Sequence, residues 1–504
     1  MGGRNKKRRQ KIVKILLVKP QTELLVAKRL QEGFLHLEPL ELEIVAGGIP
    51  KENDVQILDL SVENKPNAKF KKKLINYKPQ MIGFSAYSNT FHIVKRLALI
   101  AKECDPTVKV IVGGIHATLR PKDFAVKSID IIVRGEGGTV IGEIIRRFHE
   151  RKELYFGNAV LSPSDPDFEQ KAEKDMPFYP LVEQIPMARR DLIDHSKYFC
   201  IWTSSDTGRL STIFPRVASM RTSQGCPFSC SFCVIHQVMH KKYLRRQPED
   251  VIDEIIGLKE NYIYFVDDEM FADTHRAKII AELLLERNIR KKYISWARSD
   301  TIAKHPELFR LWKKAGLDVV YVGLESMNEE ALNEYNKKIS VETNRKAIAI
   351  LKNIGIMLHA SFIVRPDFSV EDFKNLEATI AEISPVEITF TVLSPSPGTQ
   401  MWNDNMNDFI CDPFKYYDCM HTLVPTKLTL RRFYQHFGRL YSLALRSNPL
   451  RVNRIKIPLC DLVRAMISGT KYVFSLYLIY KDYPPIMWLK AGAEQRKSLA
   501  KQVK

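Results

Sequence analysis

The most informative stretch of the chain is RTSQGCPFSCSFCVIHQ, residues 221–237, which brings Cys226, Cys230 and Cys233 together in the spacing C-x3-C-x2-C. Three thiolates on one short loop can each hold a different iron of a cubane cluster, and the fourth iron is then left without a protein ligand. A structural zinc site normally uses four ligands on paired C-x2-C arms, and no second pair of cysteines lies nearby in the sequence. The spacing therefore favours an iron–sulfur cluster with one open iron over a zinc knuckle or a chance grouping.

Outward from this segment, strands and amphipathic helices alternate. Six βα units, counting one that begins at the cysteines, predict a full or partial barrel of parallel strands, whose chemistry would gather at the carboxyl ends of the strands. Polar residues stand at those ends, namely Asp267, Asp268, Arg298, Glu325 and Arg365. The expected strands are 263–268, 293–300, 317–326, 356–364 and 386–395.

The first 150 residues show the same alternation with Gly-rich turns at several strand ends. Apolar runs predict strands near 12–18, 56–61, 81–88, 108–114 and 128–138. The helix expected at 89–104 would turn Phe91, Val94, Leu97, Leu99 and Ala101 toward the core, with Asn89 or Thr90 as its N-cap. A doubly wound parallel sheet with a ligand crevice at its strand ends follows.

We therefore expect an α/β protein of several parts. A Rossmann-like domain would span residues 10–150, a Pro- and Asp-rich linker 151–210, a βα barrel 211–400, and a helical, aromatic C-terminal region 401–504.

The cysteine segment resembles the radical S-adenosylmethionine superfamily in its three cysteines, their spacing and the aromatic Phe232 before the third. The resemblance implies that Cys226, Cys230 and Cys233 bind a 4Fe-4S cluster and form the catalytic centre. It also implies that the open iron chelates S-adenosylmethionine, and that one electron from a donor such as flavodoxin or ferredoxin cleaves this cofactor to a 5′-deoxyadenosyl radical.

The same resemblance suggests further contacts with S-adenosylmethionine. By position, FVDDEMF matches the family strand that contacts the methionine amine, so Asp267, Asp268 and Glu269 are candidates. Glu325 in VGLES stands where the family contacts the ribose, and Arg298 ends the strand between them. Solvation of the barrel mouth or a salt bridge is the alternative reading of each acid.

Three Gly- and Ser-rich strand ends, GFSAYSNTF, VGGIHATLRP and VRGEGG, resemble the cobalamin-binding domain of cobalamin-dependent radical enzymes. Small residues would let the backbone approach the nucleotide tail and the corrin edge of cobalamin. The implied contacts are Ser85, Ser88, Gly113, Gly114, Gly135, Glu136 and Gly137.

One departure concerns the lower face of cobalt. Many cobalamin domains carry D-x-H-x-x-G, in which the histidine binds cobalt, whereas this chain has Asp59-Leu60-Ser61-Val62-Glu63-Asn64. Either the cobalt has no histidine ligand or the domain has lost the cofactor.

Longer stretches resemble the hopanoid C-3 methylase group over nearly the entire chain. These are FLHLEPLELEIVAGG at 34–48, QIPMARRDL at 184–192, ASFIVRPDFSVEDF at 360–373 and FTVLSPSPGT at 390–399. Arg365 departs from the small or acidic residue expected at its position. Related enzymes acting on porphyrins, archaeal lipids and antibiotics share this architecture, so the resemblance leaves the substrate open.

The function that this resemblance implies is methylation of an unactivated carbon of a lipid such as a hopanoid, with methylcobalamin as the methyl donor. The alternatives are cyclisation or methylation of another lipid, a porphyrin or a secondary metabolite. RNA modification is a third reading, raised by the net charge of +19 and by KKRR at 6–9, and a non-catalytic redox sensor is a fourth. Without an RNA-binding appendage after the barrel, we expect no nucleic-acid partner.

Hydropathy and charge bear on location. The longest apolar-looking stretch, YVFSLYLIY at 472–480, is shorter than the roughly 20 residues that span a bilayer, and the N-terminus lacks the features of a secretory signal. We therefore expect a cytoplasmic protein without a membrane span. The tail mixes Tyr472, Phe474, Leu476, Leu478 and Trp488 with lysines, a pattern typical either of a helix lying at the inner face of the membrane or of a core helix packed on the barrel.

Overall fold

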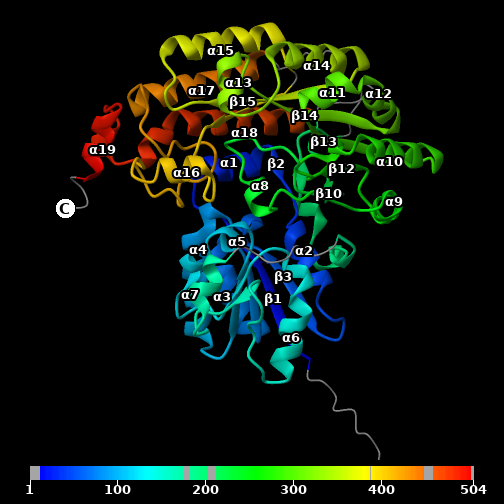
Figure 1. Cartoon of the computed structure of the whole chain (residues 1–504), viewed down its shortest axis with the longest axis vertical. Helices are drawn as coiled ribbons and strands as arrows, with labels where there is room; N and C mark the ends of the chain where they lie inside the picture. Colours follow the sequence, from blue (N-terminus) through cyan, green and yellow to red (C-terminus); the bar gives the residue numbers. More distant parts are fainter. Residues whose placement is uncertain (1–11, 175–181, 203–211, 386, 448–457, 501–504) are drawn as a thin grey trace, which may run out of the picture. The chain divides into compact units, whose positions relative to one another are not determined.

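The computed structural model describes residues 12–174, 182–202, 212–385, 387–447 and 458–500 (Figure 1). The basic run at 6–9 lies outside them. Two compact units are formed, one by residues up to Thr22 with Pro39–Asp194 and the other by Glu23–Glu38 with His195–Lys504. The domain boundaries expected from the sequence stay a prediction.

The first unit is built on a six-stranded sheet in the order β3-β1-β4-β5-β6-β7. The first five strands are parallel and β7 pairs antiparallel with β6. This confirms the Rossmann-like expectation, and it places β7 inside the stretch expected as a linker. The strands are β1 (Lys14–Lys19), β3 (Asp54–Asp59), β4 (Met81–Ser85), β5 (Lys109–Gly113), β6 (Ile131–Val133) and β7 (Val160–Leu161).

Helices connect these strands, as a parallel sheet requires. They are α2 (Leu40–Gly47), α3 (Pro66–Tyr77), α4 (Phe91–Cys104), α5 (Ile115–Leu119), α6 (Ile141–His149) and α7 (Phe168–Glu173).

Helix α4 corrects one expected core residue. Phe91, Val94, Leu97 and Ala101 are buried as expected, but Leu99 is 52% exposed and Ala98 is buried instead. Each residue turns a helix by about 100°, which carries position 99 away from the buried stripe. Thr90 occupies the N-cap without a side-chain hydrogen bond to the helix.

The second unit contains the partial barrel. Its six strands are all parallel and follow the order β9-β12-β13-β14-β15-β16. They are β9 (Val217–Met220), β12 (Tyr262–Phe265), β13 (Lys292–Ala297), β14 (Leu317–Glu325), β15 (Met357–Val364) and β16 (Glu387–Val392). The six expected units are confirmed.

Helices and short strands complete this unit. The helices between the barrel strands are α8 (Ile235–Val238), α9 (Pro248–Gly257), α10 (Thr274–Glu286), α11 (Ser299–Lys304), α12 (Pro306–Ala315), α13 (Glu329–Glu334), α14 (Val341–Ile354) and α15 (Val370–Ile383). Two short antiparallel pairs join β2 (Leu35–His36) to β8 (Phe199–Cys200) and β10 (Ser223–Gln224) to β11 (Leu244–Arg245).

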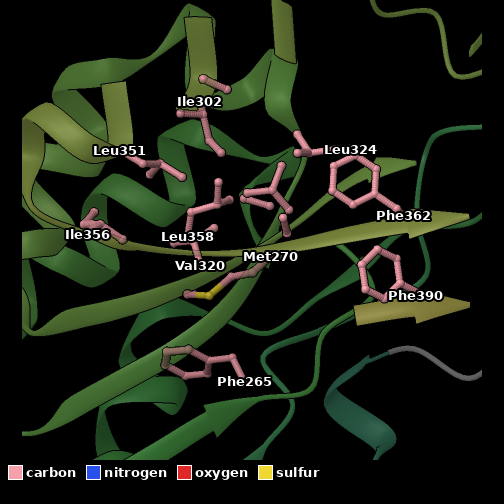
Figure 2. Packing of buried hydrophobic residues seen from close by; sticks show 14 of the residues in the cluster. Phe265, Met270, Ile302, Val320, Leu324, Leu351, Ile356, Leu358, Phe362 and Phe390 are labelled. Atoms are coloured by element: carbon pink, nitrogen blue, oxygen red, sulfur yellow. The ribbon is translucent and has the colours of Figure 1, made fainter. Parts of the chain in front are cut away.

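The largest apolar core lies between this sheet and its helices. Figure 2 shows Phe265 of β12, Val320 of β14, and Leu358 and Phe362 of β15 pointing into one cluster. Parallel strands with apolar side chains of this kind need cover on the sheet, and α9 to α15 supply it. The core therefore fixes the strand ends that carry the polar residues.

A helical C-terminal region follows the barrel, as expected. It contains α16 (Gln400–Asp404), α17 (Leu430–Ser447), α18 (Leu459–Leu478) and α19 (Ala493–Ala500), and α18 packs on α17 and on α1 (Leu25–Gly33) (Figure 1). Tyr472 and Leu476 are buried there, whereas Phe474 is exposed. The tail aromatics therefore do not share one face.

Candidate active site at the strand ends

The three cysteines lie on the loop that follows β9. Cys230 is buried, while Cys226 and Cys233 are partly exposed. Gly225 begins the bend with a φ of +89°, and a Cβ there would lie 2.1 Å from the carbonyl oxygen of Lys242. Only glycine fits that close approach, so the loop is fixed directly before its first thiol.

Burial disfavours the charged form of two of these thiols. It raises the pKa of Cys226 to about 12 and that of Cys233 to about 11. A thiol in such surroundings becomes a thiolate when a cation is bound beside it. Three thiols on one loop are thus a donor set that fits an iron–sulfur cluster.

Two of the three acids after β12 hold the cysteine loop in place. Asp267 accepts hydrogen bonds from the hydroxyls of Thr222 (2.7 Å) and Ser223 (2.5 Å) as well as from their backbone N–H groups. Asp268 accepts one from the backbone N–H of Gly225 at 2.7 Å. Both carboxylates are therefore engaged by the chain itself, on the segment that leads into Cys226.

Glu269, the third acid, is different. It is 3% exposed, and its Oε1 atom is buried without a hydrogen-bond partner among the described residues. Burial raises the pKa of Glu269 to about 8, although the positive charges of Arg298 and Lys337 lower it. Because the charge of Glu269 also acts on Cys226, the two groups are near neighbours. A buried acceptor beside the cysteine loop is suited to a cationic ligand group.

Arg298 links the end of β13 to the cysteine loop. Its guanidinium donates to Asp300 (2.9 Å) and to the carbonyl of Lys337 (2.7 Å), and its Nη1 lies 3.7 Å from Cys230 Sγ. The guanidinium carbon also sits 3.8 Å from the ring centre of Phe228. A fixed positive charge therefore lies against the Cys230 thiol.

Glu325 ends β14 in an unusual backbone conformation. Its φ is +60°, a region that costs energy for a residue with a side chain, and the pairing with β15 is irregular at this point. Its Oε1 accepts a hydrogen bond from Lys337 Nζ at 2.7 Å, with both residues buried. The Lys337 ammonium also lies 6.0 Å from the ring of Phe232.

The sequence analysis missed Lys337. Lys337 lies in an irregular segment between Asn336 and Lys338, both of which have positive φ. Its partner Glu325 is 12 residues earlier in the sequence. The signal available in the sequence was a lysine pair directly after a short helical pattern, and such pairs are usually solvated. Arg365, by contrast, is engaged by Asp367 and Glu334 at the end of β15.

In the first unit, the Gly- and Ser-rich loops lie at the carboxyl ends of adjacent strands, as expected. Ala86 donates its N–H to the carbonyl of Gly113 (2.8 Å), and His116 donates its N–H to the carbonyl of Ala86 (3.1 Å). Ser88 Oγ lies 3.0 Å from Nδ1 of the buried His116. The loops after β4 and β5 are thus joined to one another.

The glycines of these loops differ in how much space the chain leaves for a side chain. Gly114 has a φ of +99°, and a Cβ there would lie 2.7 Å from the carbonyl oxygen of Ala86, so loop packing requires it. A Cβ on Gly137 would meet Val45 at 3.3 Å. On Gly113 it would find its nearest neighbour at 3.8 Å, which is ordinary contact. The chain's own packing therefore does not require a glycine at position 113. Close approach of a bound ligand would account for it.

The loop after β3 carries no imidazole. Asp59 accepts hydrogen bonds from the N–H (2.8 Å) and the hydroxyl (2.5 Å) of Ser61, which stands where D-x-H-x-x-G has its histidine. The remaining cofactor candidates of this unit, Ser85, Gly135 and Glu136, lie in the same row of strand-end loops. This arrangement fits a cobalamin whose cobalt takes no ligand from this position.

Family comparisons agree with this division of the chain. The B12 binding domain matches residues 33–145, and the Radical SAM superfamily matches residues 220–380. The chain is 29% identical to the hopanoid C-3 methylase of Methylococcus capsulatus over 411 residues, which cover 80% of this chain and 75% of the methylase. It is also 29% identical to the anaerobic magnesium-protoporphyrin IX monomethyl ester cyclase of Rubrivivax gelatinosus, over 63% of this chain and 56% of the cyclase.

Solved structures with the same fold are cobalamin-dependent radical enzymes. OxsB with aqua-cobalamin bound aligns with a TM-score of 0.63 at 15% identity, covering 98% of this chain and 84% of OxsB. TsrM from Kitasatospora setae, with cobalamin and a [4Fe-4S] cluster bound, aligns with a TM-score of 0.62 at 13% identity, covering 98% of this chain and all of TsrM. At these identities the likeness extends to the fold.

Proposed function

We propose, from the premise that the chain belongs to the cobalamin-dependent radical S-adenosylmethionine methyltransferases, that it methylates an unactivated carbon of a polycyclic or isoprenoid lipid such as a hopanoid. Its cofactors are a 4Fe-4S cluster, S-adenosylmethionine and cobalamin. The observation that carries the proposal is the loop of three thiols at the strand ends together with the buried Glu269, whose Oε1 atom has no hydrogen-bond partner among the described residues.

When bound, these cofactors supply a carbon radical that removes hydrogen and a methyl group that replaces it. The chain's own groups have other tasks, which we assign as follows. Cys226, Cys230 and Cys233 hold three irons, and Asp267 and Asp268 keep their loop in shape. No acid or base of the chain is needed for homolytic chemistry.

Charged groups around the thiols would position S-adenosylmethionine. Glu269 is a buried acceptor for the ammonium of its methionine part, and Arg298 and Lys337 place positive charge for the carboxylate. Glu325 holds Lys337 and faces the ribose by analogy with the family. Ion pairs in a buried site of this kind exclude water from the reacting centre as well as orienting the cofactor.

For cobalamin, we assign contacts to the strand-end loops of the first unit. Ser85, Ser88 and Gly113 follow adjacent strands, and the segment from Gly135 to Gly137 forms the next loop of the row. Gly113 supports this assignment most directly, since its missing side chain is not required by the chain's own packing.

The lipid substrate is supported by the relationship to the hopanoid C-3 methylase, which covers most of both chains. The relationship to the magnesium-protoporphyrin ester cyclase supports cyclisation as the second candidate reaction. We also propose that the electron comes from a flavodoxin or ferredoxin, and that the enzyme works on the cytoplasmic side of a membrane.

The test compares the lipids of cells with and without the gene, grown with methionine labelled in its methyl group. Methylation predicts a lipid that gains one labelled methylene unit only when the gene is present. Loss of two hydrogens without label would show cyclisation instead. An unchanged lipid profile together with a labelled porphyrin or other metabolite would reject the lipid substrate and keep the reaction.

A further inference from the structure

Helix α18 carries a continuous apolar stripe on its outer side. We call the five residues of this stripe the outer stripe; they are Leu459 (75% exposed), Val463 (46%), Met466 (63%), Ile467 (50%) and Phe474 (63%). Steps of four, three, one and seven residues keep them on one side of an α-helix, along a length of about 22 Å. Large apolar groups in such a row are unusual on a surface that faces only water.

The opposite side of α18 is firmly packed. Tyr472 and Leu476 are 4% and 0% exposed, and the Tyr472 ring contacts those of Phe34 (5.4 Å) and Tyr441 (5.6 Å). On α1, a Cβ at Gly33 would lie 2.9 Å from Ser468, so the two helices approach closely. The helix cannot turn its outer stripe inward without losing this packing.

Basic residues accompany the stripe. Lys471 on α18 is exposed, and so is Lys481, three residues after the helix ends. Two more exposed apolar residues, Ile486 (44%) and Leu489 (69%), follow the helix close to Lys490. Apolar groups with a basic border are complementary to a bilayer that contains anionic lipid.

Length and composition alone would also allow this helix to cross a membrane. Residues 459–482 have a mean hydropathy of 1.2 over their most apolar window, 28% of which is buried. The sequence analysis missed this because it considered only the apolar run at 472–480. A spanning helix would have to leave α1 and α17, whereas a helix lying in the plane of the interface keeps those contacts and buries the outer stripe.

We propose that α18 docks the enzyme on an anionic bilayer surface, with the outer stripe inserted among the lipid chains and the helix parallel to the membrane plane. The reason for docking rests on the proposed function, since an enzyme that acts on a lipid has to reach it in the bilayer. The surface itself is defined by the exposure of five residues and by their charged surroundings.

The experiment is flotation of the full-length protein with vesicles of phosphatidylcholine alone or mixed with phosphatidylglycerol. We expect the protein to float with the anionic vesicles, and the double variant Met466→Glu, Phe474→Glu to bind at least about tenfold more weakly because two large apolar groups no longer enter the lipid. The matched control is Ile256→Glu, which changes a residue that is 54% exposed on α9. Circular dichroism must show the same helix content and melting for all three proteins.

A second variant reports where residue 474 lies in the bilayer, rather than how tightly the protein binds. Phe474→Trp should show a blue-shifted emission with anionic vesicles and quenching by brominated lipid, because the indole then lies among the acyl chains. The proposal is overturned if the wild-type protein stays with the soluble fraction, or if the double variant floats as well as the control. It is also overturned if the wild-type protein is a dimer that the double variant separates while neither binds vesicles, since a second copy would then cover the stripe.

The experiments can reject the membrane-docking proposal and the lipid-substrate proposal independently of one another. Flotation needs no cofactor and no substrate, so loss of vesicle binding leaves the labelled-lipid result untouched. Conversely, a non-lipid product would reject the proposed substrate while vesicle binding could still be measured.

Discussion

Glu325 has a left-handed backbone conformation, with a φ of +60°, and its carboxylate is bonded to the buried Lys337. Strained residues of this type persist where the surroundings fix them, and they concentrate at functional sites. The carbonyl of Lys337 also accepts from Arg298, which reaches Cys230. One lysine therefore connects two strand ends to the cysteine loop.

We predict that Lys337→Gln raises the KM for S-adenosylmethionine by about tenfold or more with a smaller change in kcat, since one charge-assisted bond contributes roughly 1.5–3 kcal/mol. The measurement is cofactor cleavage at varied S-adenosylmethionine concentration. Lys338→Gln is the matched control, because Lys338 is exposed. A purely structural Lys337 would instead give a lower melting temperature with an unchanged KM.

At the same scale, the position of the cysteine loop is easier to predict from the sequence than the contacts of the acids that follow β12. The cysteine spacing is local, so the loop could be predicted from its residues. Asp267 and Asp268 were expected as cofactor contacts, but their hydrogen bonds to Thr222, Ser223 and Gly225 span more than 40 residues and need the fold to be seen.

Among the elements, the loop that follows strand β3 determines whether the chain offers a histidine ligand to the cobalt of cobalamin. Ser61 replaces the histidine of D-x-H-x-x-G and is bonded to Asp59. We predict that the electron paramagnetic resonance spectrum of cob(II)alamin bound to the wild-type protein lacks the nitrogen splitting that a histidine ligand causes. Splitting from a protein nitrogen, retained when free cobalamin is removed, would contradict this.

The segment at 418–421 is held by a buried histidine to the 3-10 helix Ile479–Asp482, which follows α18. His421 lies 2.9 Å from Asp418 and 3.1 Å from Asp482. Burial alone would lower its pKa, but the two aspartates raise it to about 9. A histidine whose folded pKa exceeds its unfolded value stabilises the protein fully below about pH 6.5, and this contribution is lost as the pH rises through about 9.

His421→Gln should therefore lower the free energy of unfolding by up to about 3 kcal/mol at pH 6 and by clearly less at pH 10. Denaturant unfolding at both pH values measures the difference, with the exposed His275→Gln as control. Equal destabilisation at both pH values would mean that His421 is uncharged in the folded protein.

Strands were predicted more accurately than helix faces, for a physical reason. A buried parallel strand is a short apolar run whatever surrounds it, so its position can be predicted within a few residues. Which side of a helix is buried depends on what packs there. Leu99 on α4 was expected to share a face with residues that prove to be buried, and it is exposed.

For the whole molecule, the net charge of +19 is open to three interpretations, namely nucleic acid, an anionic membrane surface or solubility alone. We assign part of it to anionic lipid around α18 and none to nucleic acid. Vesicle binding should therefore weaken as salt screens these charges, while transfer RNA at physiological salt should not displace the protein from vesicles. Displacement by RNA in a flotation assay would favour the RNA-modification reading.

The account as a whole depends on three thiols binding a cluster that leaves one iron open to S-adenosylmethionine. The most direct test incubates the anaerobically reconstituted full-length protein with S-adenosylmethionine and a reductant, and quantifies 5′-deoxyadenosine by mass spectrometry. We predict that it accumulates with the wild-type protein and with Cys460→Ala, an exposed cysteine elsewhere, but not with Cys230→Ala. Absence of 5′-deoxyadenosine from wild-type protein whose iron and sulfide content shows an intact cluster would contradict the account.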